Sequence, residues 1–153
     1  MSSQRHATVV GLGSVLPERI VSNEWFESFI DTSDEWIRER TGIRERHYAL
    51  DGQTTSDLAT DATRRALETA AIAPEQIDLL VCATLTGDTP IPSTAVWVQR
   101  KLGITAPAFD VNAACAGFSY ALSTATAFIE SGQAETVVVM GAEILSRVMN
   151  FHD

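Results

Sequence analysis

Strand-like and helix-like patterns of apolar residues alternate along this chain. The continuous apolar run at residues 77–85 (IDLLVCATL) is typical of a strand covered on both faces, as in a parallel sheet, and residues 135–143 (ETVVVMGAE) predict the last clear strand. Shorter runs predict further strands at residues 7–11 and 107–111. Helices are predicted over residues 23–30, 32–41, 55–71, 94–102 and 118–131. This alternation predicts an α/β layered fold with a largely parallel sheet.

Capping residues mark several of the predicted helix ends. Thr32 and Glu35 have the spacing of a capping box, and Gly42 stands where the same helix should stop. Ser93 is placed to cap the helix that follows it. These signals place residues 32–41 on a helix with defined ends.

Composition and charge narrow the possible functions. The chain has 153 residues, of which 45% are hydrophobic and 20% charged, as expected for a soluble domain with its own core. The net charge of -9 argues against nucleic-acid binding, which depends on clustered basic charge. No run approaches the roughly 18 apolar residues of a membrane span, and no signal-peptide pattern opens the chain. We therefore expect a cytoplasmic protein without nucleic-acid or membrane partners.

The two cysteines differ in their sequence surroundings. No CxxC or Cys/His cluster predicts a metal site. Cys82 lies within a predicted strand and is expected in the core. Cys115 lies among small residues just before the helix predicted over residues 118–131, where unpaired N–H groups and the helix dipole favour a thiolate. A backbone N–H there is placed to form part of an oxyanion hole. Position alone leaves Cys115 as either a nucleophile or a small buried residue.

A cysteine nucleophile normally needs a base or hydrogen-bond partner. The three histidines are His6, His47 and His152, and none stands in a context that predicts contact with Cys115. The sequence therefore offers a nucleophile without an evident partner.

Arginines are concentrated in residues 36–47 (WIRERTGIRERH). Trp36 and Arg40 are four residues apart, so they point to the same side of a helix. A guanidinium suits phosphate and an indole offers a stacking face, so this pair predicts a site for an anionic, base-bearing ligand. For Arg38 and Arg46 we favour a solvated helix face with internal salt bridges.

The segment GLGSVL (residues 11–16) has two glycines of a dinucleotide-binding fingerprint. Its third position is Leu16, and Pro17 follows where the fingerprint needs a helix. A turn that ends a strand is therefore the favoured interpretation.

Three segments together resemble the β-ketoacyl-acyl carrier protein synthase III family, the condensing enzymes that start bacterial fatty-acid synthesis. They are residues 31–47 (DTSDEWI with RTGIRERH), 109–122 (FDVNAACAGFSYAL) and 131–147 (SG followed by VVVMGAEILSR). The resemblance covers nearly all of the chain. It implies a thiolase-like fold, in which residues 1–153 form the N-terminal half of a duplicated α/β/α sandwich with a largely parallel sheet of the five-stranded type. The C-terminal half, which carries the catalytic histidine and asparagine, would lie outside this chain.

The resemblance also implies roles for particular residues. Cys115 would take an acyl group from acyl-CoA as a thioester, which is then attacked by the carbanion that malonyl-acyl carrier protein forms on losing carbon dioxide. Thr32, Trp36 and Arg40 would lie near the adenine end of CoA. Ile91 would lie in a loop that reaches the acyl pocket of the partner in a homodimer. It replaces a larger aromatic residue, so primers longer or more branched than acetyl are expected. No cofactor and no metal are implied.

Without the second half, the chain should not carry out the condensation and should at most acylate itself slowly. Three other functions remain open at this point. An acyltransferase or a polyketide starter enzyme of the same superfamily would share this half. A half-length chain is also compatible with a non-catalytic interaction module.

Overall fold

The computed structural model describes residues 5–150, which divide into two compact units. Unit 1 comprises residues 5–15 and Thr54–Glu143, and unit 2 comprises Leu16–Gln53 and residues 144–150. Each unit is described by itself. Among the described residues, no helix has the length and apolar character that a membrane crossing requires.

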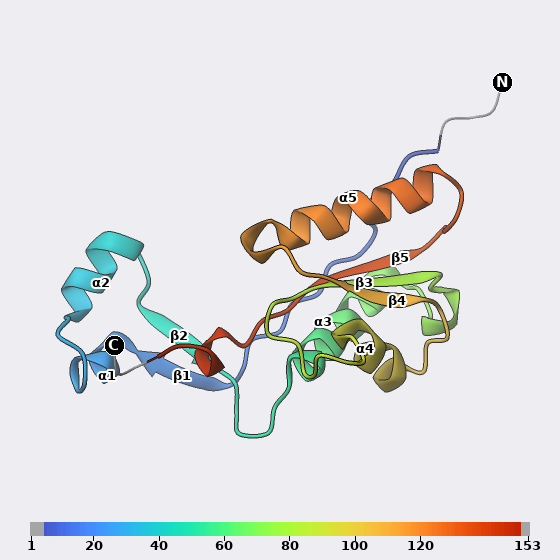
Figure 1. The fold of residues 1–153 in the computed structure, drawn as a ribbon. Coiled ribbons are helices and arrows are strands. Elements are labelled where there is room, and N and C mark those ends of the chain that lie inside the picture. The colour runs from blue at the N-terminus through green and yellow to red at the C-terminus, as the bar shows by residue number, and fades with distance from the viewer. Residues whose placement is uncertain (1–4, 151–153) are drawn as a thin grey trace. The chain divides into compact units, whose positions relative to one another are not determined.

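Unit 1 is built around a parallel sheet (Figure 1). Strand β3 (Leu79–Ala83) pairs with β4 (Ala108–Val111) on one side and with β5 (Val137–Gly141) on the other, and both pairings are parallel. Helices cover both faces of the sheet: α5 (Gly117–Glu130) lies on one, and α3 (Thr55–Ala70) and α4 (Thr94–Leu102) lie on the other. The predicted α/β fold with a parallel sheet is confirmed.

The central strand β3 is buried along its whole length because both of its faces are covered. Leu80 and Cys82 belong to the core that includes Val98 of α4, whereas Val81 belongs to the core that includes Ala121 of α5. This two-residue alternation is what a strand between two helical layers requires. The nearly continuous apolar run in the sequence therefore predicted the burial of β3 correctly.

The sheet has three strands among the described residues, fewer than the five-stranded type expected. The predicted buried strand over residues 7–11 is wrong, because this segment is extended but pairs with no strand. Val9 and Val10 are 64% and 62% exposed. The local apolar pattern predicts an extended conformation here. An extended segment becomes a strand of a sheet only when a neighbouring strand pairs with it.

Close packing on α3 explains the two glycines of GLGSVL. A Cβ on Gly11 would lie 2.4 Å from the Ala66 carbonyl oxygen, and one on Gly13 would lie 2.2 Å from the Ala62 carbonyl oxygen. Neither glycine has a left-handed φ. These glycines let the N-terminal segment lie directly on α3. The structure therefore supports neither the expected turn nor the dinucleotide-binding alternative.

Unit 2 contains two short strands and two helices. Strands β1 (Arg19–Ser22) and β2 (Glu45–Tyr48) pair in antiparallel fashion, and helices α1 (Asn23–Glu27) and α2 (Asp34–Thr41) lie between them in sequence. A small core of Val21, Phe26 and Tyr48 holds this unit together. The strands were not predicted, because their sequences, RIVS and ERHY, carry little apolar pattern.

Two of the predicted helix caps are wrong. Ser33, rather than Thr32, caps α2, and its hydroxyl accepts the Trp36 N–H at 3.1 Å. Ser93 precedes α4 but makes no side-chain cap bond. Gly42, with φ of 74°, ends α2 as predicted.

Candidate active site

Cys115 lies at the carboxyl end of the parallel sheet, where β4 leads into α5. It is the middle residue of a 3-10 turn, η2 (Ala114–Ala116), and α5 begins two residues later. Its side chain is exposed, which excludes a buried packing role within this chain. Ligands of open parallel sheets bind beyond the carboxyl ends of the strands, so Cys115 stands where a reacting group is expected.

The turn that carries Cys115 has an unusual backbone. Ala114 has φ of 46°, in a left-handed region that costs a non-glycine residue about 1 kcal/mol or more. The Ala116 N–H donates to the Ala113 carbonyl oxygen at 3.1 Å, and the Gly117 N–H donates to the Ala114 carbonyl oxygen. Such conformations cluster at active sites, which makes this turn a candidate for one.

The first turn of α5 is held tightly against the strand ends. A Cβ on Gly117 would lie 3.3 Å from the Cβ of Ala83, so glycine lets the helix begin close to the end of β3. Phe118 lies against Gly141 of β5, where an added Cβ would be 3.1 Å from the Phe118 ring. The start of α5, directly after the Cys115 turn, is therefore fixed against β3 and β5.

Cys82 has the opposite environment. It is fully buried, and burial, followed by the negative charges of Asp110, Glu143 and Asp88, raises the pKa of its thiol to about 12. The prediction that Cys82 is a core residue is confirmed.

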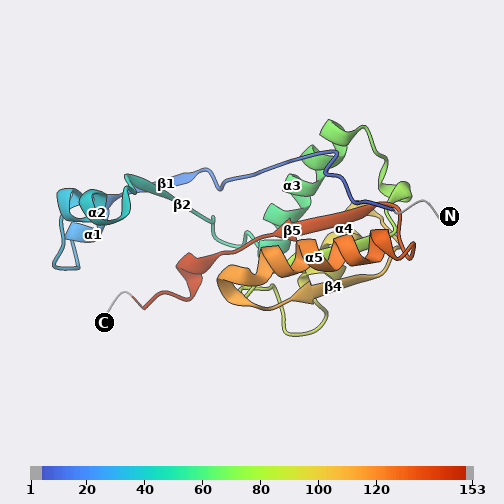
Figure 2. The ribbon, with the colours of Figure 1, turned by 90° about the horizontal axis from the view of Figure 1, so that it is seen from above.

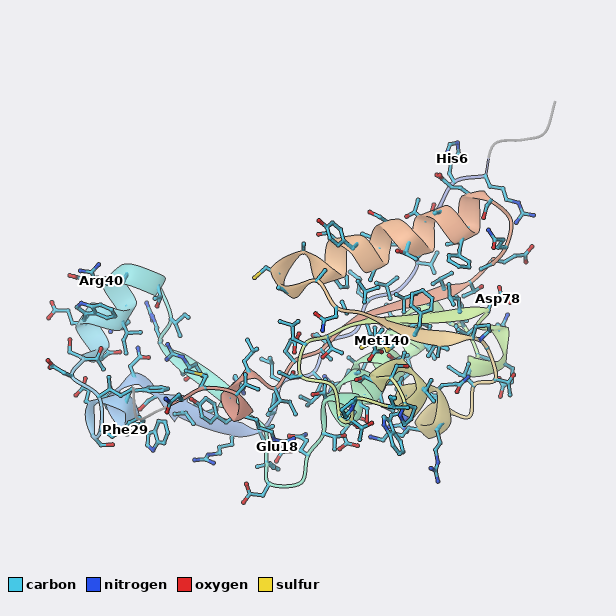
Figure 3. The ribbon with its side chains drawn as sticks, in the orientation of Figure 1. His6, Glu18, Phe29, Arg40, Asp78 and Met140 are labelled. Atoms are coloured by element: carbon cyan, nitrogen blue, oxygen red, sulfur yellow. The ribbon has the colours of Figure 1, made fainter. Side chains whose placement is uncertain are left out.

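The histidines do not supply Cys115 with a partner in unit 1. His6 lies 3.9 Å from Glu130 at the far end of α5 (Figure 3). That helix has 14 residues, so its ends are about 20 Å apart. His47 belongs to unit 2, where its Nδ1 lies 2.6 Å from the Pro17 carbonyl oxygen. His152 lies outside the described residues.

Unit 2 brings Trp36 and Arg40 together, as the sequence predicted. The guanidinium of Arg40 lies over the indole ring, 4.7 Å from its centroid, and 53% of Trp36 is exposed. Ile37 is buried on the other side of the helix and fixes its orientation. Thr32 is half-buried just before α2. The pair thus presents an aromatic surface and a cation side by side.

Arg38 and Arg46 make contacts within unit 2. Arg38 forms the predicted salt bridge, 3.2 Å from Asp34. Arg46 lies on β2 rather than on a helix, donates to Asn23 at 2.7 Å and stacks over Phe26. The expected salt bridge on a helix face therefore holds for Arg38, whereas Arg46 donates to the uncharged side-chain amide of Asn23.

Asn23 is a buried residue that the sequence analysis missed. Its side-chain amide donates to Asp34 and to the Ile43 carbonyl oxygen, each at 2.8 Å. The Asn23 hydrogen bond, with that of Arg38, lowers the pKa of Asp34. One fully buried side chain thereby ties both ends of α2 to α1 and positions Trp36 and Arg40.

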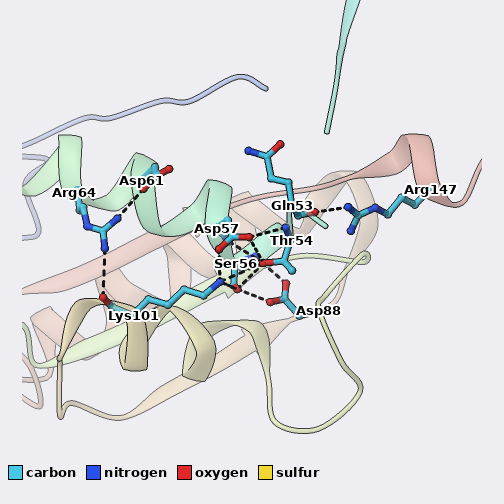
Figure 4. A network of polar contacts seen from close by, with 9 residues as sticks. All are labelled: Gln53, Thr54, Ser56, Asp57, Asp61, Arg64, Asp88, Lys101 and Arg147. Carbon is cyan, nitrogen blue, oxygen red and sulfur yellow. Dashed lines mark hydrogen bonds and ion pairs between the residues drawn. The ribbon is translucent and has the colours of Figure 1, made fainter. Parts of the chain in front are cut away.

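Ile91 is 87% exposed, on the loop that joins β3 to α4. A network of polar contacts holds the base of this loop (Figure 4). The Asp88 carboxylate accepts the Ser56 N–H at 2.8 Å and also the Ser56 hydroxyl. Lys101 donates to Ser56 and, at 2.6 Å, to Asp57. Asp88 thus anchors the loop to α3, Lys101 joins α4 to the same point of α3, and Ile91 faces solvent.

Two carboxylates at strand ends complete the support of the site. Asp110 of β4 accepts the Thr94 and Ala95 N–H groups at 2.6 and 2.8 Å, and so caps α4 in place of Ser93. Glu143 accepts the Leu85 N–H at 2.7 Å. Acidic residues at the ends of predicted parallel strands were the available signal, because such ends meet at one edge of the sheet.

Comparison with known proteins places the chain in a family. The family model for 3-Oxoacyl-[acyl-carrier-protein (ACP)] synthase III matches residues 109–153. The β-ketoacyl-[acyl-carrier-protein] synthase III of Ruegeria pomeroyi is 57% identical over 96% of this chain and 46% of its own length, and that of Xanthomonas campestris pv. campestris is 51% identical over 100% and 47%. The chain belongs to the β-ketoacyl-[acyl-carrier-protein] synthase III family.

Solved synthase III structures share its fold. The Aquifex aeolicus VF5 enzyme superposes with a TM-score of 0.91 and 46% identity, over 94% of this chain and 47% of its own. The priming β-ketosynthase of the R1128 polyketide pathway gives a TM-score of 0.94 and 40% identity, over 100% of this chain and 46% of its own. The chain thus spans about half the length of the synthase III proteins it matches, and its fold is one half of the duplicated fold. The described residues contain no group of three or more potential metal ligands.

Proposed function

We propose that this chain is the nucleophile-bearing half of a β-ketoacyl-acyl carrier protein synthase III. The observation that carries the proposal is that Cys115 is exposed. It lies on a strained turn just before the N-terminus of α5, at the carboxyl end of the sheet. The small neighbours Ala113, Ala114, Ala116 and Gly117 leave room for a thioester carbonyl beside the sulfur.

The proposed reaction has two stages. The Cys115 thiolate attacks the acyl-CoA carbonyl, an acyl-cysteine thioester forms, and CoA leaves as a thiol after taking up a proton. Malonyl-acyl carrier protein then loses carbon dioxide, and the resulting carbanion attacks the acyl-cysteine carbonyl. A carbon–carbon bond forms, and the Cys115 sulfur leaves as the thiolate. Groups from the second half would assist this condensation, so the chain alone should complete only the first stage.

The remaining roles follow from unit 2 and from the loop of Ile91. Trp36 and Arg40 would hold the adenine and phosphate groups of CoA, with Thr32 beside them. Ile91 would reach the acyl pocket of a second subunit in a homodimer. Acyl-CoA and acyl carrier protein are the proposed partners, the cytoplasm is the proposed location, and no bound cofactor is required.

Acylation of Cys115 is the direct test. With radiolabelled acetyl-CoA, the wild-type chain and the Cys82→Ala variant should carry label in an acid-stable, hydroxylamine-sensitive thioester, because Cys82 is inaccessible. The Cys115→Ala variant should carry none. Label of equal intensity on Cys115→Ala would overturn the assignment of the nucleophile.

A polyketide starter enzyme is the second candidate. Its support is the TM-score of 0.94 with the R1128 priming β-ketosynthase, together with isoleucine at position 91. Acylation rates with acetyl-CoA and with longer or branched acyl-CoA would separate the two, since a starter enzyme of that kind should favour the larger primers.

A further inference from the structure

A cluster of hydroxyl and charged side chains joins the start of α3, the end of α4 and the loop between β3 and α4 (Figure 4). The two helices lie side by side on one face of the sheet (Figures 1 and 2). Ser56 is fully buried within this cluster. The Lys101 ammonium donates to the Ser56 hydroxyl oxygen, and the Ser56 hydroxyl donates to the Asp88 carboxylate. Lys101 is therefore linked to the loop through Ser56.

Donor and acceptor chemistry fixes the direction of the Ser56 hydroxyl. An ammonium group can only donate, so the Ser56 oxygen accepts from Lys101. An ionised carboxylate can only accept, so the Ser56 hydrogen points to Asp88. The Ser56 backbone N–H donates to the same carboxylate at 2.8 Å. Asp88 is thus held by two donors, one of which is oriented by a cation.

Removal of the Lys101 cation would weaken this arrangement in two ways. The Ser56 hydroxyl would be free to turn to Thr54 Oγ1, which lies 3.1 Å away. The carboxylates of Asp57 and Asp88 would remain at the cluster without the positive charge that Lys101 brings to it. The side chain of Lys101 is only 30% exposed, so solvent screens these interactions less than those of a surface pair.

Hydrogen bonds inside the loop connect Asp88 to the tip. Thr89 follows Asp88, and its hydroxyl donates to the Pro92 carbonyl oxygen at 3.0 Å, across Ile91. The Trp97 indole N–H donates to the Thr89 oxygen at 3.0 Å. A displacement of Asp88 would therefore reach Ile91, and the Trp97 indole would report it.

We propose that Lys101 is a positioning residue for the loop of Ile91. It acts through Ser56 and Asp88, and it thereby contributes to the choice of acyl primer. The effect on primer choice rests on the proposed function, in which Ile91 reaches an acyl pocket. The effect on the loop rests on the hydrogen bonds alone.

The Trp97 indole tests the effect on the loop in the chain itself, without substrate. Lys101→Met keeps the apolar stem of the side chain and removes the charge. In heteronuclear NMR it should shift the Trp97 indole resonance and speed hydrogen exchange at that N–H about fivefold or more. The indoles of Trp25 and Trp36, which belong to unit 2, serve as references.

A double variant separates the path through Ser56 from a direct effect along α4, because Lys101 and Trp97 are four residues apart on that helix. Ser56→Ala alone should also speed exchange at the Trp97 indole. Adding Lys101→Met to it should then cause little further change. Arg64→Met is the matched control, since Arg64 is a cation of α3 that pairs with exposed Asp61.

Two results would each overturn the role of Lys101 in the loop. One is a Trp97 indole that Lys101→Met leaves unchanged or that Arg64→Met affects equally. The other is a full effect of Lys101→Met in the Ser56→Ala background, which would show that Lys101 acts directly along α4.

Primer choice is measured in the full-length protein. Lys101→Met should bring the kcat/KM values for acetyl-CoA and a branched acyl-CoA about threefold or more closer together, because a loosely held loop discriminates less. Alkylation of Cys115 should proceed at the same rate as in Arg64→Met. An unchanged kcat/KM ratio with a shifted Trp97 indole would overturn the effect on primers alone. Absence of acylation at Cys115 in the wild type would instead reject the proposed function.

Discussion

Cys82 lies inside the sheet, and Cys115 lies on an exposed turn at the end of the same sheet. The two thiols are chemically identical, so their environments decide their reactivity. Burial removes water from Cys82 and disfavours its thiolate, whereas Cys115 is open to solvent and to reagents. The contrast was predictable from the sequence, because a strand interior and a helix start have different local patterns.

Alkylation should distinguish the two cysteines. At neutral pH, iodoacetamide should add one label to the folded chain, at Cys115, and a second only after denaturation. The pKa of Cys82 is raised from 9.0 to about 12, so its folded form stays protonated and stability should fall as pH rises above about 9. Intact-mass spectrometry counts the labels, and equal labelling of Cys82 in the folded chain would contradict this account.

At the scale of elements, the sequence predicted features that depend on local pattern and missed those that depend on distant partners. The strand and helix around Cys115, and the Trp36–Arg40 pair, follow from periodicity. The cap of α4 comes from Asp110, which is 16 residues away from Thr94. The sequence around Thr94 does not identify this partner, and the available signal was an acidic residue at the end of a separate predicted strand. The strand predicted at residues 7–11 failed for the same reason, because among the described residues no strand pairs with this segment.

Helix α2 makes a prediction about ligand affinity. Arg40→Ala should weaken CoA binding about tenfold, since it removes the cation beside Trp36. Arg38→Ala is the matched control, because Arg38 pairs with Asp34 on the same helix. Isothermal titration with CoA measures both, and similar losses would show that α2 is not the binding element.

Helix α3 makes a prediction about stability. Asp57 forms a capping box with Thr54 and accepts from Lys101. Partial burial alone would raise its pKa, but the Lys101 and Thr54 hydrogen bonds lower it from 3.8 to about 2. Asp57→Ala should lower the free energy of unfolding by about 1–2 kcal/mol at pH 7.

The pH dependence follows from the lowered pKa of Asp57. Its contribution is complete above pH 3.8 and is lost as pH falls through about 2, so the variant and wild type should converge in strong acid. Asp61→Ala, which removes an exposed pair with Arg64, should change stability by less than about 0.5 kcal/mol. Urea unfolding across this pH range provides the measurement, and a constant difference would contradict the assignment.

At the scale of the whole molecule, the chain has the core of one half of the family fold but leaves apolar surfaces uncovered. Phe118 and Tyr120 on α5 are both more than half exposed. Such surfaces favour association, so the isolated chain should behave differently from a protein in which these surfaces are covered.

Primer preference belongs to the full-length protein. There, Ile91→Phe should shift kcat/KM toward acetyl-CoA and away from branched primers, because a larger side chain would shorten the proposed acyl pocket. Tyr120→Phe serves as a control on an exposed residue outside the loop. Competition assays with paired primers measure the ratio, and an unchanged ratio would remove Ile91 from the pocket.

The loop around Ile91 is clamped at both ends by carboxylates. Asp88 binds Ser56 at its beginning, and Asp110 binds the first N–H groups of α4 at its end. Asp110 also belongs to the strand that leads into the Cys115 turn. Mutations between these two contacts can therefore accumulate without displacing the Cys115 sulfur, so the proposed primer range and the proposed thioester chemistry would be free to evolve separately.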